Sequence, residues 1–406
     1  MTYKRKKRAV SQLLNSKSIS SRKSTICDEI DYILGKLVLE VTANEDIDLA
    51  TYLKYFTLRC SVFLMYGLHL DCFGKDHALC DEIIRNESEI IRLRSPISNI
   101  EDSVTLLRYF PKLTNAHKAV ECGQTRNGYM NELYARFQEG AKDGNDNNDC
   151  TNSFVGQLLA QRGSKRLSEA EIYSICLTFI SAGLDNTPLN LNYLLGILSQ
   201  PVIGQMYQSK AIHNILDNCS GDVVVAWEQS GEANFENAYV HVLVLETLRH
   251  FTVLPLSLPR TTTKPFLHGD VIIPANTHLF LNAYAANNDE EHFESPLEFW
   301  PERWLDERGQ SNFAAKINQH FSFGAGSRMC SGSSFALYEM YVFMVKFLLL
   351  FEVHPPDSKL MITDPFANNG NGRATSFEPR SHHVKLIRRQ LLSPNEDKIR
   401  DVALRI

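Results

Sequence analysis

The sequence predicts a mainly α-helical protein with small β-sheets, and three observations support this fold class. Apolar residues recur at mixed three- and four-residue spacing over residues 30–41 and 49–70, which is typical of amphipathic or buried helices. Residues 333–350 form an apolar segment whose length favours a buried helix over a strand. Short β-prone runs occur mainly between residues 260 and 282, so we expect the strands in the second half of the chain.

A long helix is expected over residues 168–195, near the middle of the chain. Ser168 can cap its first turn, and Glu171, three residues later, can complete a capping box in which each side chain binds the other residue's backbone N–H. Another helix is expected over residues 234–250, because Pro255 follows it and cannot continue a helix.

Two short runs, residues 271–273 and 279–281, are expected to pair as a small hairpin, since Gly, Asp and Pro bound them. With 44% hydrophobic and 22% charged residues, the composition is that of an ordinary globular protein with a large core. The sequence contains no internal repeat. We therefore expect one domain over residues 1–390 and a charged C-terminal tail over residues 391–406.

Charge and cysteine usage exclude several classes of protein. The net charge of -5 gives no general reason to expect a nucleic-acid partner, and one basic run at residues 4–8 (KRKKR) is weak support for one. The nine cysteines are odd in number and form no CxxC pair, so neither a zinc site nor a disulfide framework is expected. Reduced thiols are expected instead. No segment reaches the roughly 18–20 apolar residues that span a bilayer.

The loop before residues 333–350, with the sequence FSFGAGSRMCSG, is the strongest candidate site. It holds a single cysteine, Cys330, among glycines that allow tight turns and close approach to a flat partner. The positive end of the following helix stabilises a thiolate, and Arg328 adds a cation. The alternative is an inert, buried structural cysteine near a turn.

Glu246 and Arg249 are three residues apart in a predicted helix and so lie on one of its faces. A second arginine, Arg303, follows in the polar run PERW. One carboxylate between two guanidinium groups could hold this run against the helix. Taken alone, however, Glu246 and Arg249 are better explained by a surface ion pair that contributes little to stability.

Residues 182–187 (AGLDNT) place a glycine and three polar side chains inside the long apolar helix predicted at 168–195. Polar groups in a protein core need hydrogen-bond partners or a function. Asp185, Asn186 and Thr187 are therefore candidate catalytic residues. The alternative is a local helix kink, favoured by the adjacent Pro188.

Together, these motifs resemble the cytochrome P450 family of haem-thiolate monooxygenases. The EXXR, PERF-type and oxygen-activation motifs of the family correspond to Glu246 with Arg249, to PERW with Trp in place of Phe, and to AGLDNT. The phrases GAGSRMC and SAGLD are similar to those of fungal phenylacetate hydroxylases. The haem-binding signature of the family is matched at Phe323, Gly326, Arg328, Cys330 and Gly332.

The resemblance implies the cytochrome P450 fold, here without its first helices and strands, and haem b (iron protoporphyrin IX) as the cofactor. The Cys330 thiolate would be the axial ligand of the haem iron, a ligand type that favours O–O bond cleavage. Phe323 would pack on the sulfur side of the haem, and Arg328, Arg260 and Lys7 would bind its propionates. Lys7 stands where the family usually has Arg, and it lacks the fork geometry of a guanidinium.

The same resemblance assigns roles to the remaining candidates. Asp185 would relay protons during oxygen activation. Asn186 occupies the position where the family usually has Thr, and Thr187 follows about 100° further round the helix. Glu246, Arg249 and Arg303 would form a structural triad behind the haem.

By resemblance, the protein would insert one atom of O2 into a small organic substrate, for which an aromatic compound is a candidate. NADPH–cytochrome P450 reductase would supply the electrons, and no nucleic-acid partner is expected. A full-length relative would lie on the cytosolic face of the endoplasmic reticulum. Its membrane association would depend on an N-terminal anchor that we do not find in this chain.

Three alternatives stay open at this point. The first is a truncated or inactive haem-binding relative without turnover, which Asn186 and the unmatched N-terminal part of the family favour. The second is a haem-thiolate isomerase or dehydratase that needs no reductase, although the retained Asp185 favours the monooxygenase. The third is nucleic-acid binding by residues 4–8.

Overall fold

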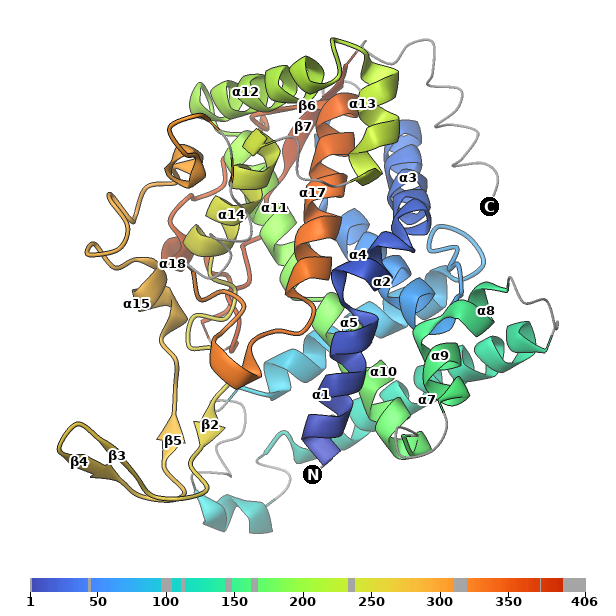
Figure 1. The fold of residues 1–406 in the computed structure, drawn as a ribbon, viewed down its shortest axis with the longest axis vertical. Coiled ribbons are helices and arrows are strands. Elements are labelled where there is room, and N and C mark those ends of the chain that lie inside the picture. Colours follow the sequence, from blue (N-terminus) through green and yellow to red (C-terminus); the bar gives the residue numbers. More distant parts are fainter. Residues whose placement is uncertain are drawn as a thin grey trace.

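The structure is a computed structural model of the chain. Helices form the body of the molecule, and small antiparallel sheets lie at its edges (Figure 1), so the predicted fold class is confirmed. The predicted tail, residues 391–406, lies outside the described residues. The structure describes residues 2–42, 45–95, 104–110, 114–142, 148–161, 167–232, 238–309, 311, 320–372 and 374–389.

The first part of the chain is helical apart from one short strand. Its central helix is α4, which is buried along most of its length and packs against α3, α10 and α11. The helices here are α1 (Thr2–Leu13), α2 (Ser16–Ser20), α3 (Lys23–Glu40), α4 (Ala50–Tyr66), α5 (His77–Leu93), the 3-10 helix η1 (Thr105–Tyr109), α7 (Ala116–Ala141), α8 (Asp149–Asn152) and α9 (Phe154–Ala160).

The second part combines helices with the longer irregular segments. Its helices are α10 (Glu169–Gly183), α11 (Asn186–Leu198), α12 (Ile203–Asn218), α13 (Val223–Gln229), η4 (Ser230–Glu232), α14 (Ala238–His250), α15 (Ala283–Asn287), η5 (Pro301–Trp304), η6 (Gly326–Arg328), α17 (Ser333–Leu350) and α18 (Pro365–Asn368).

The predicted capping box at the start of α10 is confirmed. The Ser168 hydroxyl accepts from the backbone N–H of Glu171 at 3.2 Å, and the Glu171 carboxylate accepts from the backbone N–H of Ser168 at 3.0 Å. The single long helix predicted over residues 168–195 was wrong, because the structure divides it into α10 and α11. The division falls at Leu184 and Asp185, within the polar motif.

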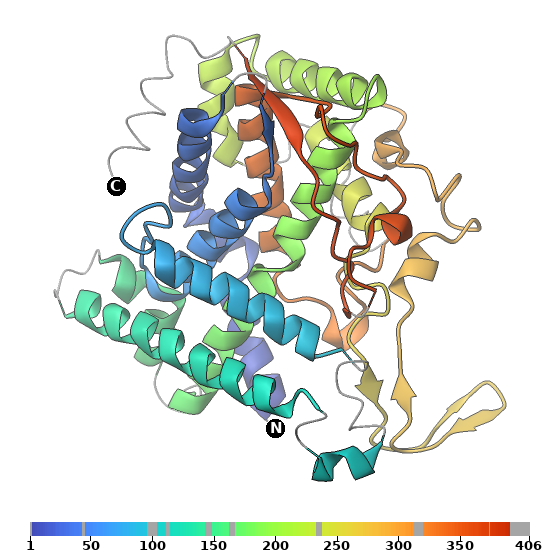
Figure 2. The same cartoon turned by 180° about the vertical axis from the view of Figure 1, so that it is seen from behind.

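The predicted pairing of residues 271–273 with 279–281 was also wrong. Strand β4 (Val271–Ile273) pairs with β3 (Phe266–His268), and β5 (His278–Leu279) pairs with β2 (Arg260–Thr261). Two hairpins are therefore nested, with the inner one projecting from the helical body (Figures 1 and 2). The tight turn at Gly269, with φ of 57°, places β3 opposite β4.

A third sheet lies on the opposite side of the molecule from these hairpins. In it, β7 (Val384–Arg388) lies between β1 (Asp46–Ile47) and β6 (Phe351–His354), and both pairings are antiparallel. Strand β6 begins where α17 ends, so the sheet continues the core formed by that helix.

Helix α17 has the predicted bounds and forms the centre of the core (Figure 1). In the part of the chain that the structure describes, it is the one helix long and apolar enough to cross a membrane. Because 89% of it is buried inside the protein, its apolar surface is already covered by other helices. This helix fixes the position of the cysteine loop that precedes it.

Candidate active site

The cysteine loop is built from successive tight turns. Gly324 and Gly326 adopt φ values of 70° and 65°, a left-handed conformation that glycine accepts without strain. The backbone N–H of Cys330 then donates to the carbonyl of Phe323 at 2.9 Å, which closes the loop. Cys330 is thereby held three residues before the first residue of α17, Ser333.

Cys330 is the exposed cysteine of the chain, whereas six others are buried and two are half-buried. All nine are free thiols, as the sequence predicted. Desolvation by the surrounding protein raises the pKa of the Cys330 thiol, while the backbone N–H of Gly332 and the charge of Lys7 act to lower that pKa. The sulfur is therefore accessible to a partner and is faced by groups that stabilise its thiolate form.

Helix α1 lies against the cysteine loop. The Lys7 ammonium donates to the backbone carbonyls of Ser327 and Met329, the latter at 3.4 Å. One turn earlier on the same helix face, the Tyr3 ring lies under the Arg328 guanidinium, with 3.4 Å between the guanidinium carbon and the ring centroid. The basic run at the start of the chain thus contributes one cation, Lys7, to the cysteine loop.

The predicted cofactor ligands include three cations, Lys7, Arg328 and Arg260. None of them forms an ion pair with a carboxylate of the described residues. Arg260 is exposed on β2 and donates to the carbonyl of Pro259 at 3.3 Å, so this hydrogen bond joins it to neither Lys7 nor Arg328. An exposed thiol and cations without carboxylate partners fit a haem, which offers an iron for the sulfur and two propionates for the cations.

Glu246 is fully buried and is the centre of a hydrogen-bond network. Its carboxylate accepts from Arg249 through Nε at 3.0 Å and Nη2 at 2.7 Å, and from Arg303 Nε at 3.2 Å. The structure therefore brings together the three residues that the sequence grouped as a triad. Arg249 is completely buried, which excludes the surface ion pair considered above for Glu246 and Arg249.

Sequence reasoning missed further members of this network. The indole N–H of Trp304 donates to Glu246 at 2.8 Å, and the backbone N–H of Trp300 donates to the same carboxylate at 2.9 Å. Arg249 also donates to the backbone carbonyls of Asn287 and Pro296, both at 2.8 Å. The bond from Trp304 could have been anticipated from the sequence, because PERW has an indole N–H donor where the family usually has Phe.

Asp185 stands at the break between α10 and α11. Burial, and to a smaller extent the charge of Glu378, raise the pKa of its carboxyl group to about 7, while Lys54 acts to lower that pKa. Among the described residues, no donor forms a hydrogen bond with the Asp185 carboxylate. Asn186 follows, and its side-chain amide donates to the Ala182 carbonyl at 3.4 Å. A carboxyl group that titrates near neutral pH is suited to proton transfer.

The third candidate of this motif, Thr187, has a different environment. Its buried hydroxyl donates to Oε1 of Glu339 on α17 at 2.7 Å. Glu339 is fully buried, and the sequence analysis did not identify it. The two residues are 152 positions apart in the chain, so no local pattern connects them.

Comparison with known proteins decides the family. The family model described as "Cytochrome P450" matches residues 2–373, which is nearly the whole chain. The chain belongs to the cytochrome P450 family. The mainly helical fold with small antiparallel sheets agrees with that membership, and the resemblance found in the sequence is confirmed.

Curated relatives of this P450 include two fungal enzymes of Emericella nidulans. Phenylacetate 2-hydroxylase is 34% identical over 385 residues, which cover 94% of this chain and 71% of the relative. 3-Hydroxyphenylacetate 6-hydroxylase is 28% identical over 387 residues, covering 95% and 71%. A cytochrome P450 monooxygenase of Mycosarcoma maydis is 30% identical over 403 residues, covering 97% and 72%.

The enzyme class follows from these findings. The P450 is an oxidoreductase of the monooxygenase type, as the sequence predicted. Its family implies a haem cofactor, O2, an organic substrate and a redox partner. The exposed Cys330 thiol and the cations around its loop fit such a cofactor.

Proposed function

We propose that this P450 hydroxylates a small aromatic substrate, with arylacetic acids as the first class to test. Two of its relatives are named for hydroxylation of phenylacetate and 3-hydroxyphenylacetate. NADPH–cytochrome P450 reductase is the proposed electron donor. Residues 1–390 form the proposed monooxygenase domain, which would act at the cytosolic face of the endoplasmic reticulum.

The observation that carries this proposal is the exposure of Cys330 and the environment of its thiol. An accessible sulfur, a Gly332 N–H and the Lys7 charge together provide a thiolate ligand for the iron of haem b. Lys7, Arg328 and Arg260 would bind the propionates, and Phe323 would pack on the sulfur side of the haem. Gly326 and Gly332 would allow the loop to approach the ring closely.

A bound haem would supply the O2 chemistry, and the residues at the break between α10 and α11 would supply protons. Asp185 would hold or release a proton at its carboxyl group, because burial raises the pKa of that group to about 7. Asn186 would orient a water molecule through its side-chain amide. The buried network of Glu246, Arg249 and Arg303 would fix the segment that precedes the cysteine loop.

A second candidate function is haem binding without turnover. It is favoured by the side chains that follow Asp185, because the Asn186 amide bonds to its own helix and the Thr187 hydroxyl bonds to Glu339. No alcohol is then free at this motif for proton delivery. The two functions differ in whether reductant consumption yields a hydroxylated product.

The test begins with the reduced, carbon monoxide-bound spectrum of the purified chain, with Cys330→Ala as the control. A long-wavelength Soret band that the variant lacks would support thiolate ligation. Phenylacetate and its ring-hydroxylated analogues would then be supplied with NADPH and the reductase. Product formation supports the monooxygenase, whereas the thiolate band without product from any acid supports the second candidate. Absence of the band in the wild type contradicts both.

A further inference from the structure

The bend between α10 and α11 is held from two sides. On one side, Gly183 packs so closely against Ser61 of α4 that a Cβ atom at Gly183 would lie 2.4 Å from the serine oxygen. On the other side, Thr187 bonds to Glu339 of α17. Asp185 and Asn186 lie between these two contacts. Their position therefore depends on two neighbouring helices and not only on the conformation of the bend.

The contact between Thr187 and Glu339 is the more directional of the two. Thr187 is 4% exposed and Glu339 is 2% exposed, so water cannot easily replace either partner. The threonine hydroxyl donates and the glutamate oxygen accepts, at 2.7 Å. Pro188 comes next in the first turn of α11, where its missing N–H costs no helical hydrogen bond. The start of α11 is thus joined to α17 by a side-chain bond.

Helix α17 also determines where the candidate iron ligand lies, because Cys330 precedes its first residue by three positions. Glu339 is two turns into this helix. A single rigid helix therefore connects the cysteine loop with the acceptor of the Thr187 hydroxyl. The bond sets the position of Asp185 relative to Cys330 through elements that are buried and well packed.

We propose that Glu339 and Thr187 are positioning residues of this P450 that hold Asp185 and Asn186 in place for proton delivery. This inference rests on the proposed function. Thr187 then acts through its bond to α17 and not as a catalytic residue. Loss of the bond would let the start of α11 shift, and small displacements of reacting groups lower rates strongly. Consumed reductant would then yield hydrogen peroxide and less hydroxylated product.

Three substitutions test the bond. Thr187→Val removes the hydroxyl at nearly constant volume, and Glu339→Leu removes the acceptor. Glu339→Gln retains an acceptor oxygen and similar size. Thr178→Val is the matched control, because Thr178 is exposed on α10 and its hydroxyl bonds to its own helix at 2.7 Å. NADPH consumption, peroxide and product are measured with haem-loaded protein, the reductase and an accepted substrate.

Thr187→Val and Glu339→Leu are each expected to lower the ratio of product to consumed NADPH by about tenfold. Glu339→Gln and Thr178→Val are expected to stay within about twofold of the wild type. The double variant Thr187→Val/Glu339→Leu should be no worse than the worse single variant, because both remove one bond. A Thr187→Val ratio equal to that of the wild type overturns the inference, as does a Glu339→Gln loss equal to that of Glu339→Leu. If Glu339→Leu does not fold, the ratios measured for Thr187→Val and Glu339→Gln decide whether the inference holds.

A readout without turnover separates this inference from the proposed function. Imidazole binding, followed by the Soret difference spectrum, should change several-fold in Thr187→Val and Glu339→Leu and remain unchanged in Thr178→Val. A wild type that binds haem but forms no product contradicts the proposed function alone, and the imidazole titration then decides the inference. Unchanged imidazole affinity in both variants would overturn it. A wild type that binds no haem contradicts both.

Discussion

The indole N–H of Trp304 donates to Oε2 of Glu246 at 2.8 Å, and the same oxygen accepts from Arg249 Nε at 3.0 Å. The other oxygen of Glu246 accepts from Arg249, Arg303 and the backbone N–H of Trp300. The carboxylate therefore has hydrogen-bond donors on both oxygens. Such complete pairing is what allows a buried charge to persist in a protein core.

Trp304→Phe is expected to lower the free energy of unfolding by about 1–3 kcal/mol, because it removes one donor from a buried carboxylate. Phe is also smaller than the buried indole, so lost packing adds to the loss of the hydrogen bond. Urea denaturation followed by circular dichroism measures the effect. Trp300→Phe is the control, since Trp300 donates to Glu246 through its backbone N–H and its side chain is 37% exposed. Equal losses in the two variants would contradict the prediction.

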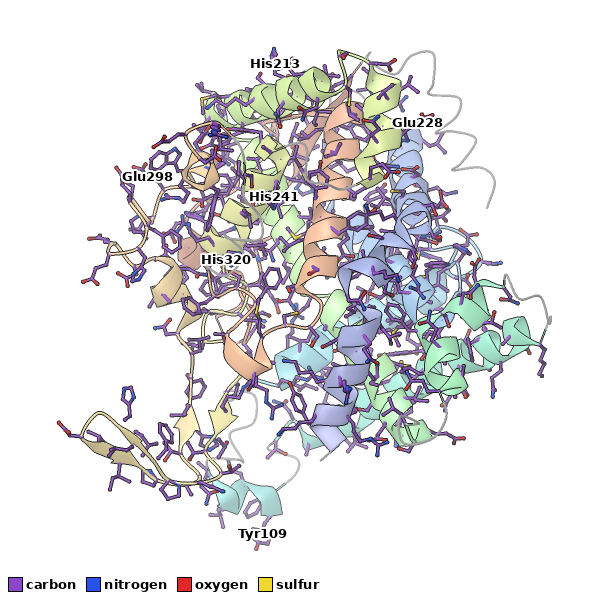
Figure 3. All side chains as sticks on the ribbon, in the orientation of Figure 1. Tyr109, His213, Glu228, His241, Glu298 and His320 are labelled. Carbon is purple, nitrogen blue, oxygen red and sulfur yellow. The ribbon has the colours of Figure 1, made fainter. Side chains whose placement is uncertain are left out.

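His320 should make the protein sensitive to acid. It lies in the interior (Figure 3), with its ring centroid 6.0 Å from that of Trp304 and 5.8 Å from that of Phe323. Burial lowers its pKa to about 4 from the ordinary 6.5, and the Arg249 charge contributes to this lowering. Between these two pH values the unfolded chain binds a proton that the folded chain does not, so stability is lost as pH falls.

The contribution of His320 is measured as the difference between the wild type and His320→Gln in free energy of unfolding from pH 7 to pH 4.5. The wild type should lose up to about 1.4 kcal/mol more per pH unit than the variant below pH 6.5. His268→Gln, on the exposed strand β3, should follow the wild type. Parallel curves for wild type and His320→Gln would show that His320 does not carry this effect.

Local sequence signals predicted the parts of the fold that depend on neighbouring residues. The bounds of α17 and the Ser168 capping box follow from periodicity and from a three-residue spacing, and both are confirmed. The spacing of Glu246 and Arg249 likewise placed both on one helix face. These features require only residues within about one turn of each other.

Contacts between distant residues could not be predicted in this way. The pairing of Thr187 with Glu339 depends on how α11 packs against α17, and nothing in either segment specifies the other. The break at Asp185 also reflects tertiary packing, since α4 approaches Gly183 closely on one side. The predicted strand pairing was wrong for a related reason. The turn at Gly269 pairs β4 with β3, which is nearer in the sequence than residues 279–281.

Lys7→Gln is expected to increase the rate of haem loss roughly threefold to tenfold, measured by transfer of haem to an excess of apomyoglobin. The substitution removes the ammonium that bonds to the carbonyls of Ser327 and Met329 and that faces the Cys330 thiol. Lys4→Gln is the control, because Lys4 is exposed on the same helix and its side chain forms no hydrogen bond or ion pair with the described residues. Equal rates for the two variants would exclude a role of Lys7 in holding the cysteine loop.

Glu339 should give the opposite pH dependence to His320. Burial raises the pKa of its carboxyl group to about 8 from the ordinary 4.5, while the Thr187 hydroxyl acts to lower that pKa. The titratable group that faces it from α4 is Cys60, whose own pKa is raised well above its usual value by burial. The folded chain therefore keeps a proton that the unfolded chain releases above pH 4.5, so stability falls as pH rises towards 8.

Glu339→Gln removes the titrating carboxyl group and should therefore reduce the loss of stability with rising pH. Between pH 5 and pH 8 the wild type is expected to lose up to about 1.4 kcal/mol more per pH unit than the variant, as measured by urea denaturation. Glu169→Gln, which changes an exposed carboxylate at the start of α10, should leave the decline unchanged. If Glu339→Gln and the wild type decline in parallel, the Glu339 carboxyl group is already ionised in the folded protein.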